Sequence, residues 1–207
     1  GRLYKASDMV KADCGGCNGC SRCCHGMGNS IILDPYDVYR MTTGMGKSMQ
    51  ELLAASVELN VVDGVILPNL KMQGTKEACA YLDEEGRCSI HPYRPGICRL
   101  FPLGRYYENG GFSYFLQTGE CAKENRSKIK VSKWIDTPDL TRNQQFTLQW
   151  HDLLHAMEER LTGEDEGKQQ EENLLLLRLF YLLPYKGTTD FYSQFMERME
   201  YWNEQIR

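Results

Sequence analysis

The pattern of apolar and polar residues predicts short elements in the first part of the chain. Residues 35–43 are expected to form a helix, because an aspartate and a proline stand at its start and Gly44 follows it. Ser48 and Glu51 have the spacing of a capping box, and this opens a second helix through about Leu59. The first part is thus expected to alternate between brief helices and turns.

Strands in the first part are predicted where a turn sequence separates two apolar runs. Asp63-Gly64 lies between two pairs of β-branched residues, which is the strongest local signal of a hairpin. Further hairpins are expected around residues 83–86 and 109–111. These strands are short, so they predict an irregular unit rather than a regular sheet protein.

The second part of the chain has the periodicity of long helices. The first is expected from about Thr137 to Leu161, with an apolar face made by Phe146, Trp150, Leu153, Leu154, Met157 and Leu161. A buried helix over residues 174–183 is ended by Pro184, and Asp190 opens a last amphipathic helix. Three such helices would form a bundle or a clamp.

Composition separates the two parts further. All nine cysteines of the 207-residue chain precede residue 122. We therefore predict an α+β protein in which residues 1–122 form a small, irregular, cysteine-rich metal-binding unit with short hairpins and helices. Residues 123–207 would form the helical region packed on it, within one compact domain.

Charge, hydropathy and cysteine count exclude several classes of protein. With 24 basic and 28 acidic residues the net charge is −4, so no overall positive field would attract nucleic acid. The longest apolar window has about ten residues, whereas a membrane-spanning helix needs roughly 20. The odd cysteine count and the lack of a signal-peptide pattern at the start indicate a reducing compartment, so we expect a cytoplasmic protein.

The strongest chemical signal is a group of five cysteines within eleven residues: Cys14, Cys17, Cys20, Cys23 and Cys24. A spacing of two residues between ligands lets a tight turn point successive sulfur atoms at one centre. Gly15, Gly16 and Gly19 supply the positive-φ conformations that such turns require. The segment therefore predicts a metal site.

Two kinds of metal centre fit this spacing. In a zinc site, Cys17 and Cys20 would form one ligand pair and later cysteines would complete a tetrahedron. In an iron–sulfur site, the cysteines at positions 14, 17, 20 and 24 would follow the run found in bacterial ferredoxins. We favour a [4Fe-4S] iron-sulfur cluster, with Zn2+ as the alternative. Cys14, His25 and His91 stay open as further ligands, since imidazole replaces thiolate in both kinds of site.

Arginines accompany the later cysteines. Arg94 and Arg99 flank Cys98, and a four-thiolate centre carries a charge of about −2 that nearby guanidinium groups would offset. We therefore expect both arginines to contribute to cofactor binding.

The cysteine pattern resembles a known family. The run Cys17-x2-Cys20-x2-Cys23-Cys24, followed by an Arg-Pro-x2-Cys-Arg segment at residues 94–99, is similar to the YkgJ-like CxxCxxCC cysteine-cluster family, whose domains are described as chelating zinc or iron. The resemblance spans residues 17–121, and Cys14 lies outside it. It implies eight metal ligands: Cys17, Cys20, Cys23, Cys24, Cys79, Cys88, Cys98 and Cys121.

Enzymatic activity is left open by this resemblance. Some members are flagellin lysine-N-methylases thought to transfer a methyl group with the help of an iron–sulfur cluster. Those enzymes are longer, and residues 122–207 show no methyl-donor site. Catalytic residues are therefore not assigned.

Two weaker signals lie outside the cysteines. His151 and His155 occupy the i,i+4 positions of metalloprotease helices, but Asp152 stands where those helices have glutamate, so ordinary helix histidines are favoured. The basic segment Lys123–Lys133 could contact a nucleic-acid backbone or an acidic protein, but a solvated loop face is favoured. The alternation of Lys128 and Lys130 with Ile129 and Val131 indicates an exposed edge strand there.

These observations predict a cytoplasmic metal-binding protein with a redox or cluster-assisted group-transfer role. The alternative is a structural zinc module, not an enzyme, for protein–protein interaction. Another protein would then bind to the C-terminal helices, and neither nucleic acid nor a membrane is expected as a partner.

Overall fold

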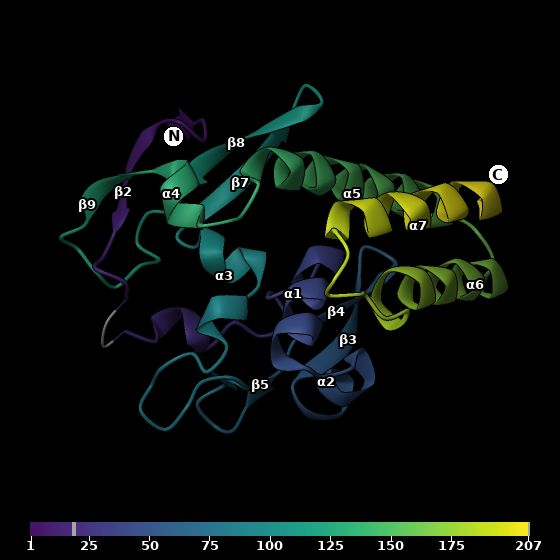
Figure 1. The fold of residues 1–207 in the computed structure, drawn as a ribbon, viewed down its shortest axis with the longest axis horizontal. Helices are drawn as coiled ribbons and strands as arrows, with labels where there is room; N and C mark the ends of the chain where they lie inside the picture. Colours follow the sequence, from purple (N-terminus) through teal and green to yellow (C-terminus); the bar gives the residue numbers. More distant parts are fainter. Residues whose placement is uncertain (18–19, 207) are drawn as a thin grey trace. The chain divides into compact units, whose positions relative to one another are not determined.

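The computed structural model describes residues 1–17 and 20–206 (Figure 1). Contacts between Cα atoms group the chain into two compact units, one made of Gly1–Gly28 with Met72–Leu148 and the other of Asn29–Lys71 with Gln149–Arg207. Each unit thus joins segments that are distant along the chain. Helices and antiparallel strand pairs together confirm the predicted α+β fold class.

The first unit contains a three-stranded antiparallel sheet in the order β1-β8-β7, and the pairs β2-β9 and β5-β6. The strands are β1 Leu3–Tyr4, β2 Met9–Asp13, β5 Met72–Gln73, β6 Ala78–Cys79, β7 Leu103–Glu108, β8 Gly111–Leu116 and β9 Ser127–Lys130. Asn109 and Gly110 join β7 to β8 with φ values of 50° and 70°. Positive φ at both positions is what the tightest hairpin turn requires, so the hairpin expected here is confirmed.

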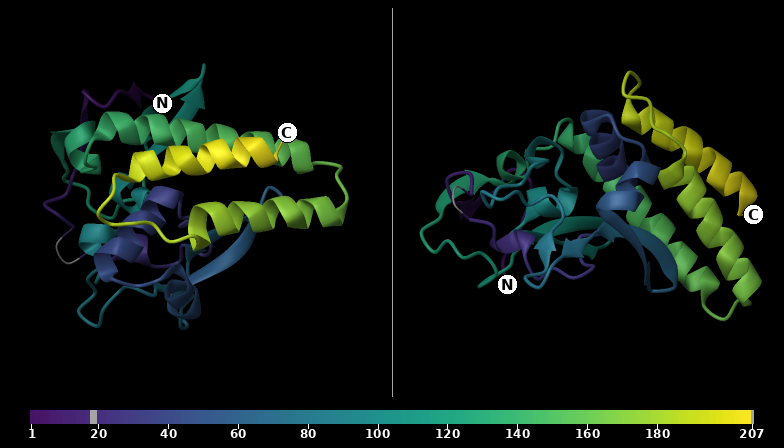
Figure 2. Two further views of the ribbon diagram at one scale, coloured as in Figure 1. Left: turned by 45° about the vertical axis from the view of Figure 1, so that its right-hand side comes forward. Right: turned by 90° about the horizontal axis from the view of Figure 1, so that it is seen from below.

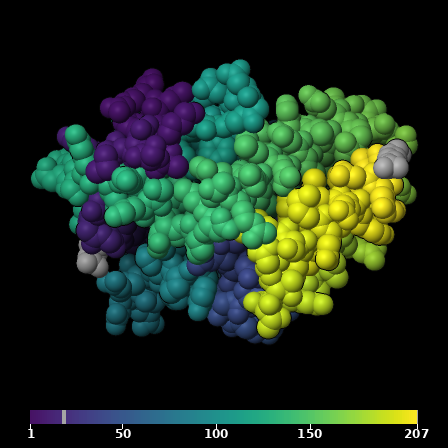
Figure 3. Space-filling view, turned by 45° about the horizontal axis from the view of Figure 1, so that its top comes forward, coloured from purple at the N-terminus to yellow at the C-terminus, as the bar shows by residue number. Residues whose placement is uncertain are grey.

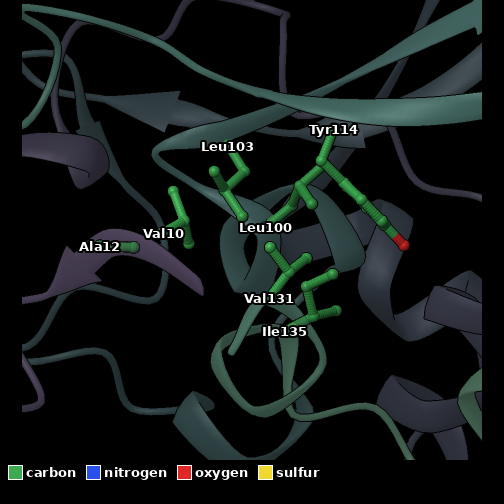
Figure 4. Close-up of a cluster of buried hydrophobic side chains, with 7 residues drawn as sticks. All are labelled: Val10, Ala12, Leu100, Leu103, Tyr114, Val131 and Ile135. Atoms are coloured by element: carbon green, nitrogen blue, oxygen red, sulfur yellow. The ribbon is translucent and has the colours of Figure 1, made fainter. Parts of the chain in front are cut away.

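A cluster of buried apolar side chains holds this unit together (Figure 4). It contains Val10, Ala12, Leu100, Leu103, Tyr114, Val131 and Ile135. Alternation explains the contribution of β2, since Val10 and Ala12 are buried while their neighbours Met9 and Lys11 are exposed. Leu100 belongs to α3 (Gly96–Leu100) and Val131 and Ile135 to α4 (Val131–Ile135), so the core fixes both short helices.

The basic segment of the first unit contains β9, which pairs with β2 in antiparallel register. Lys128 and Lys130 are exposed on it, and Ile129 is half-buried. The expected exposed strand is therefore confirmed for residues 127–130, whereas Val131 is buried and begins α4.

The second unit combines helices with one hairpin (Figure 2). Its elements are α1 Pro35–Met45, α2 Met49–Ala55, β3 Val57–Val62, β4 Val65–Leu70, the later part of α5 Leu140–Leu161, α6 Glu166–Leu177 and α7 Phe191–Gln205. Figure 3 shows α7, in yellow, lying along α5. Aromatic rings join these helices. The ring centroid of Phe180 lies 5.0 Å from that of Trp150 and 5.8 Å from that of Phe195, and the centroids of Trp150 and Phe195 are 6.3 Å apart.

A π-helical turn, Arg178–Leu182, follows α6 and leaves backbone carbonyls without their usual helical partners. The buried guanidinium of Arg198 donates to the carbonyl oxygen of Leu179 within this turn and to those of Leu183 and Pro184 just after it, at 2.8–2.9 Å. The expected C-terminal helices are thus present. Within the described part of the chain, none of the helices combines the length and apolar composition needed to cross a bilayer.

Several predicted boundaries are wrong. The first helix continues through Gly44 and is capped instead by Gly46, whose φ is 64°. The second helix ends at Ala55 rather than near Leu59, because Val57–Val62 leaves the helix to pair with β4. Residues 83–86 form a tight turn with one flanking bridge, not a hairpin of regular strands.

Candidate metal centre

The cysteines gather in the first unit because several backbone contacts tie their segments together. The segment with the clustered cysteines begins where β2 ends and passes through a short 3₁₀ turn, Arg22–Cys24. It is bound to the β5–β6 hairpin by a bridge between His25 and Ala78 and by a hydrogen bond from Gly26 N–H to Glu77 O of 2.9 Å. Cys79 is the next residue of β6, so these bonds carry it to the first cysteines.

The later cysteines follow on the same backbone framework. A bridge pairs Leu82 with Cys88, and Ser89 N–H donates to Tyr81 O at 2.8 Å. Cys98 lies on α3, which the buried core holds. Two segments that are separated in sequence by residues 29–71 therefore bring their cysteines to one region of the unit.

The first two cysteines stand close together on a tight turn. Cys14 Sγ lies 3.2 Å from Cys17 Sγ. Gly15 and Gly16 have φ values of 71° and 74°, as expected from the sequence, and Asp13 Oδ1 accepts a hydrogen bond from Gly15 N–H at 3.0 Å. The expectation for Gly19 concerns a position outside the described residues.

Cys17 shows what this crowding does to a thiol. Burial, the hydrogen bond with Cys14 and repulsion from the sulfur atoms of Cys14, Cys23 and Cys20 raise its pKa to about 12. A bound cation would reverse this balance, because coordination deprotonates a thiol outright. The arrangement thus needs positive charge at its centre to hold these sulfur atoms as thiolates.

Cys23 and Cys24 connect the first cysteines with the later ones. A hydrogen bond from Cys24 lowers the pKa of Cys23 to about 7, with further help from its backbone and from the positive charge of Arg94. The same bond raises the pKa of Cys24, as do burial and repulsion from Cys23, Cys79 and Cys88. Neighbouring side chains of this Cys-Cys pair therefore both face the group of thiols.

Cys79 and Cys88 are half-buried thiols that accept backbone hydrogen bonds. Burial raises the pKa of both, while bonds from the backbone of Tyr81 to Cys79 and of Ile90 to Cys88 act in the opposite direction. Amide donors of this kind stabilise thiolate ligands and tune the potential of iron–sulfur clusters.

Arg94 supplies positive charge among the thiols. Its Nη1 donates to His91 O at 2.8 Å, and its charge interacts with Cys23, Cys88 and Cys98. Burial, followed by repulsion from Arg99, lowers the pKa of the Arg94 guanidinium. This placement agrees with an arginine that offsets the charge of a thiolate centre.

Arg99 acts one step further out. It is buried, at 4% exposure, and its Nη1 donates to Arg94 O at 2.6 Å while its Nε donates to Thr137 Oγ1 at 3.2 Å. Arg99 therefore holds the backbone of Arg94 and links it to the chain beyond α4. The expected contribution of Arg99 to cofactor binding stays a prediction, and its contacts would make it a positioning residue.

The two histidines near the cysteines differ in setting. His25 Nδ1 lies 2.9 Å from Ser21 O, and a hydrogen bond there would leave Nε2 as the atom able to bind metal. His91 has its pKa lowered by burial and then by Arg94 and Arg87, so it is held neutral. Both stay open as ligands.

Cys98 and Cys121, the remaining expected ligands, have less direct connections to the other thiols. Cys98 is connected through the charge of Arg94. Cys121 is half-buried and forms no disulfide bond. Its role as a ligand stays a prediction.

The donor set fits a zinc or iron centre. Soft thiol donors predominate, which favours these metals over magnesium or calcium. All nine cysteines are free of disulfide bonds. As the side chains stand in the described residues, no three His, Cys, Asp or Glu groups already surround one ion, so binding would draw the sulfur atoms together.

Comparison with known proteins agrees with this donor set. The family model CxxCxxCC, described as a "putative zinc- or iron-chelating domain", matches residues 16–131, which is more than half of the chain. The matched range contains eight cysteines and leaves out Cys14. Searches of curated proteins and of solved structures find no match.

Proposed function

This chain belongs to the CxxCxxCC family, and we propose that its cysteine-rich unit holds a [4Fe-4S] cluster for electron transfer or a cluster-assisted group transfer. The proposal rests on one observation: thiols from separate segments meet around Cys23 and Cys24, beside the positive charge of Arg94. Such a centre suits a reducing compartment such as the cytoplasm, because its thiols must stay free.

Two features favour an iron–sulfur cluster over a single zinc ion. Consecutive spacings of two residues wrap a cuboidal cluster more readily than one tetrahedral ion. A structural zinc ion binds four ligands. The region offers at least five sulfur donors, which are Cys17, Cys23, Cys24, Cys79 and Cys88.

The protein's own residues would have three tasks in this function. The cysteines provide the ligands, the backbone groups of Tyr81 and Ile90 donate to the sulfur atoms of Cys79 and Cys88, and Arg94 offsets negative charge. When bound, the cluster would supply one-electron transfer. The unit would set its potential through these donors and through burial.

Anaerobic purification, followed by metal and acid-labile sulfide analysis and a visible absorption spectrum, tests the proposal. We expect iron and sulfide in equal amounts, with the broad absorption of a [4Fe-4S] cluster. Cys24→Ser should lose the metal, because Cys24 faces Cys23, Cys79 and Cys88. Cys14→Ser is the matched control and should retain it, since Cys14 lies outside the family match.

Other outcomes would contradict this assignment. Stoichiometric zinc without sulfide would identify a structural zinc module, and a search for a protein partner of the C-terminal helices would then follow. A colourless, metal-free protein that keeps its fold would overturn both metal functions. Circular dichroism of each variant separates loss of metal from loss of fold.

A further inference from the structure

A second group of metal-binding side chains lies in the unit that contains no cysteine. His151 and His155 stand one turn apart on α5, with ring centroids 6.2 Å apart and ring planes at 23°. Residues four apart lie on the same helix face, so both imidazoles can reach one ion. By itself the pair is more typical of ordinary helix histidines than of metal ligands.

The structure adds carboxylates to this pair. A cleft of about 190 Å³ is lined by His151, His155 and Glu158 of α5 and by Asp63 of the β3–β4 turn, and apolar residues line the rest. His155 Nδ1 lies 3.5 Å from Glu158 Oε2. Two imidazoles and two carboxylates from two different elements therefore border the same hollow.

The position of Asp63 is fixed by the hairpin that contains it and by contacts of its turn with α6. The strands β3 and β4 pair continuously up to Val62 opposite Val65, and Asp63 turns the chain with a φ of 51°. Asn173 of α6 then fastens the turn: its Oδ1 accepts from Ile66 N–H at 2.7 Å and its Nδ2 donates to Gly64 O at 3.2 Å. The carboxylate thus comes from a fixed backbone.

We propose that His151, His155, Asp63 and Glu158 form a second metal site, for a divalent transition-metal ion such as Zn2+. Imidazole and carboxylate ligands are those of zinc sites without cysteine, and their two negative charges balance the ion. No three of these side chains already surround one point in the described structure. The side chain of His155 is 62% exposed and therefore has room to rotate toward the other three.

The ligand chemistry separates this site from the cysteine centre. Nitrogen and oxygen donors select differently from thiolates, and an exposed site binds more weakly than a thiolate one. The inference does not depend on the proposed function, since no cysteine takes part. A failure at one centre therefore says nothing about the other.

Zinc titration of the purified full chain, with its resident metal in place, tests the inference by calorimetry. We expect one additional equivalent of Zn2+ to bind. His151→Asn and His155→Asn should each weaken it about 10- to 100-fold, the range found when support for a metal ligand is removed. Asp63→Asn should weaken it several-fold, and thermal unfolding should shift upward with zinc only in proteins that keep the site.

Asp152→Asn is the matched control, because it removes one negative charge from the same helix at a residue that lines a different groove, between α5 and α7. It should leave the affinity unchanged. The inference is overturned if wild type binds no additional zinc, or if the double variant His151→Asn/His155→Asn binds it as well as wild type. The resident metal and its absorption spectrum should be the same in every variant.

Discussion

Arg99 offers a quantitative test of how the first unit supports its metal centre, because it is a buried cation that donates hydrogen bonds to two defined acceptors. One bond goes to the backbone oxygen of Arg94, whose guanidinium lies among the thiols, and the other to Thr137 beyond α4. Replacement by methionine keeps much of the side-chain volume and removes both donors. The change therefore isolates the polar contribution.

The expected loss follows from the bonds themselves. A hydrogen bond from a charged donor contributes roughly 1.5–3 kcal/mol, and an acceptor left without a partner in a buried place adds to the loss. Two such bonds, partly offset by the apolar methionine, give a destabilisation of about 2–4 kcal/mol. That corresponds to about 30- to 900-fold faster hydrogen exchange by local opening.

Hydrogen exchange followed by mass spectrometry measures this locally. Peptides that cover α3 and the start of β7 should lose protection, while peptides from Asn29–Lys71 of the other unit should not change. Arg142→Met is the control, because Arg142 is exposed and its pair with Asp139 spans 3.8 Å, which contributes well under 1 kcal/mol. Unchanged exchange around α3 in Arg99→Met would refute the reasoning.

Three further changes test other elements. Gly110→Ala should lower the free energy of unfolding of the first unit by about 1–2 kcal/mol, because alanine is strained at the φ of 70° found there. Gly111 does not have a positive φ, so Gly111→Ala should be near neutral; thermal unfolding measures both variants. Asn173→Ala should cost about 1–3 kcal/mol and increase exchange at the β3–β4 turn, because Ile66 N–H and Gly64 O lose their partner. Removal of the metal by a chelator under reductant should raise exchange in the segments that carry the cysteines and leave α6 and α7 protected.

The turns of this fold could be predicted because their information is local. Asp63-Gly64 and Asn109-Gly110 all adopt positive φ, as these residue pairs do in tight hairpins. The predicted capping box is equally local and forms as expected: Glu51 N–H donates to Ser48 Oγ at 3.1 Å, and Ser48 N–H donates to Glu51 Oε2 at 2.7 Å. Such features depend only on a few neighbouring residues.

Element ends were harder to predict because their partners are distant. Val57–Val62 carries β-branched residues that a helix disfavours only weakly, and pairing with β4 decides its conformation. Gly44 stays inside α1, since a single glycine costs about 1 kcal/mol in a helix and packing of that helix outweighs it. The periodicity of the sequence shows neither the pairing with β4 nor the packing of α1.

In the candidate sites, too, local features could be predicted and contacts between distant segments could not. Spacing alone placed Cys14 and Cys17 on one turn, and their sulfur atoms are close. It could not show that a bond between Gly26 and Glu77 carries Cys79 to them, nor that Asp63 borders the same cleft as His151. The first comes from a strand-like bridge between distant segments, and the second from packing of a local hairpin beside a distant helix.

The thiols around Cys23 form two overlapping sets. Cys17 interacts with Cys14, Cys20 and Cys23, whereas Cys24 interacts with Cys23 and with two later cysteines. Cys23 belongs to both sets. A four-ligand centre can therefore use one set or the other, and a second centre would have to share or exchange this residue.

Charge distinguishes the two sets. Arg94 interacts with Cys23 and Cys88, and it thereby favours an anionic centre at the set that contains the later cysteines. We expect Cys79→Ser to abolish the iron and sulfide content, and Cys20→Ser to reduce it by less than half. Retained iron in Cys79→Ser together with its loss in Cys20→Ser would place the centre on the ferredoxin-like run instead, and Arg94 would then act on the protein's stability rather than on its cofactor.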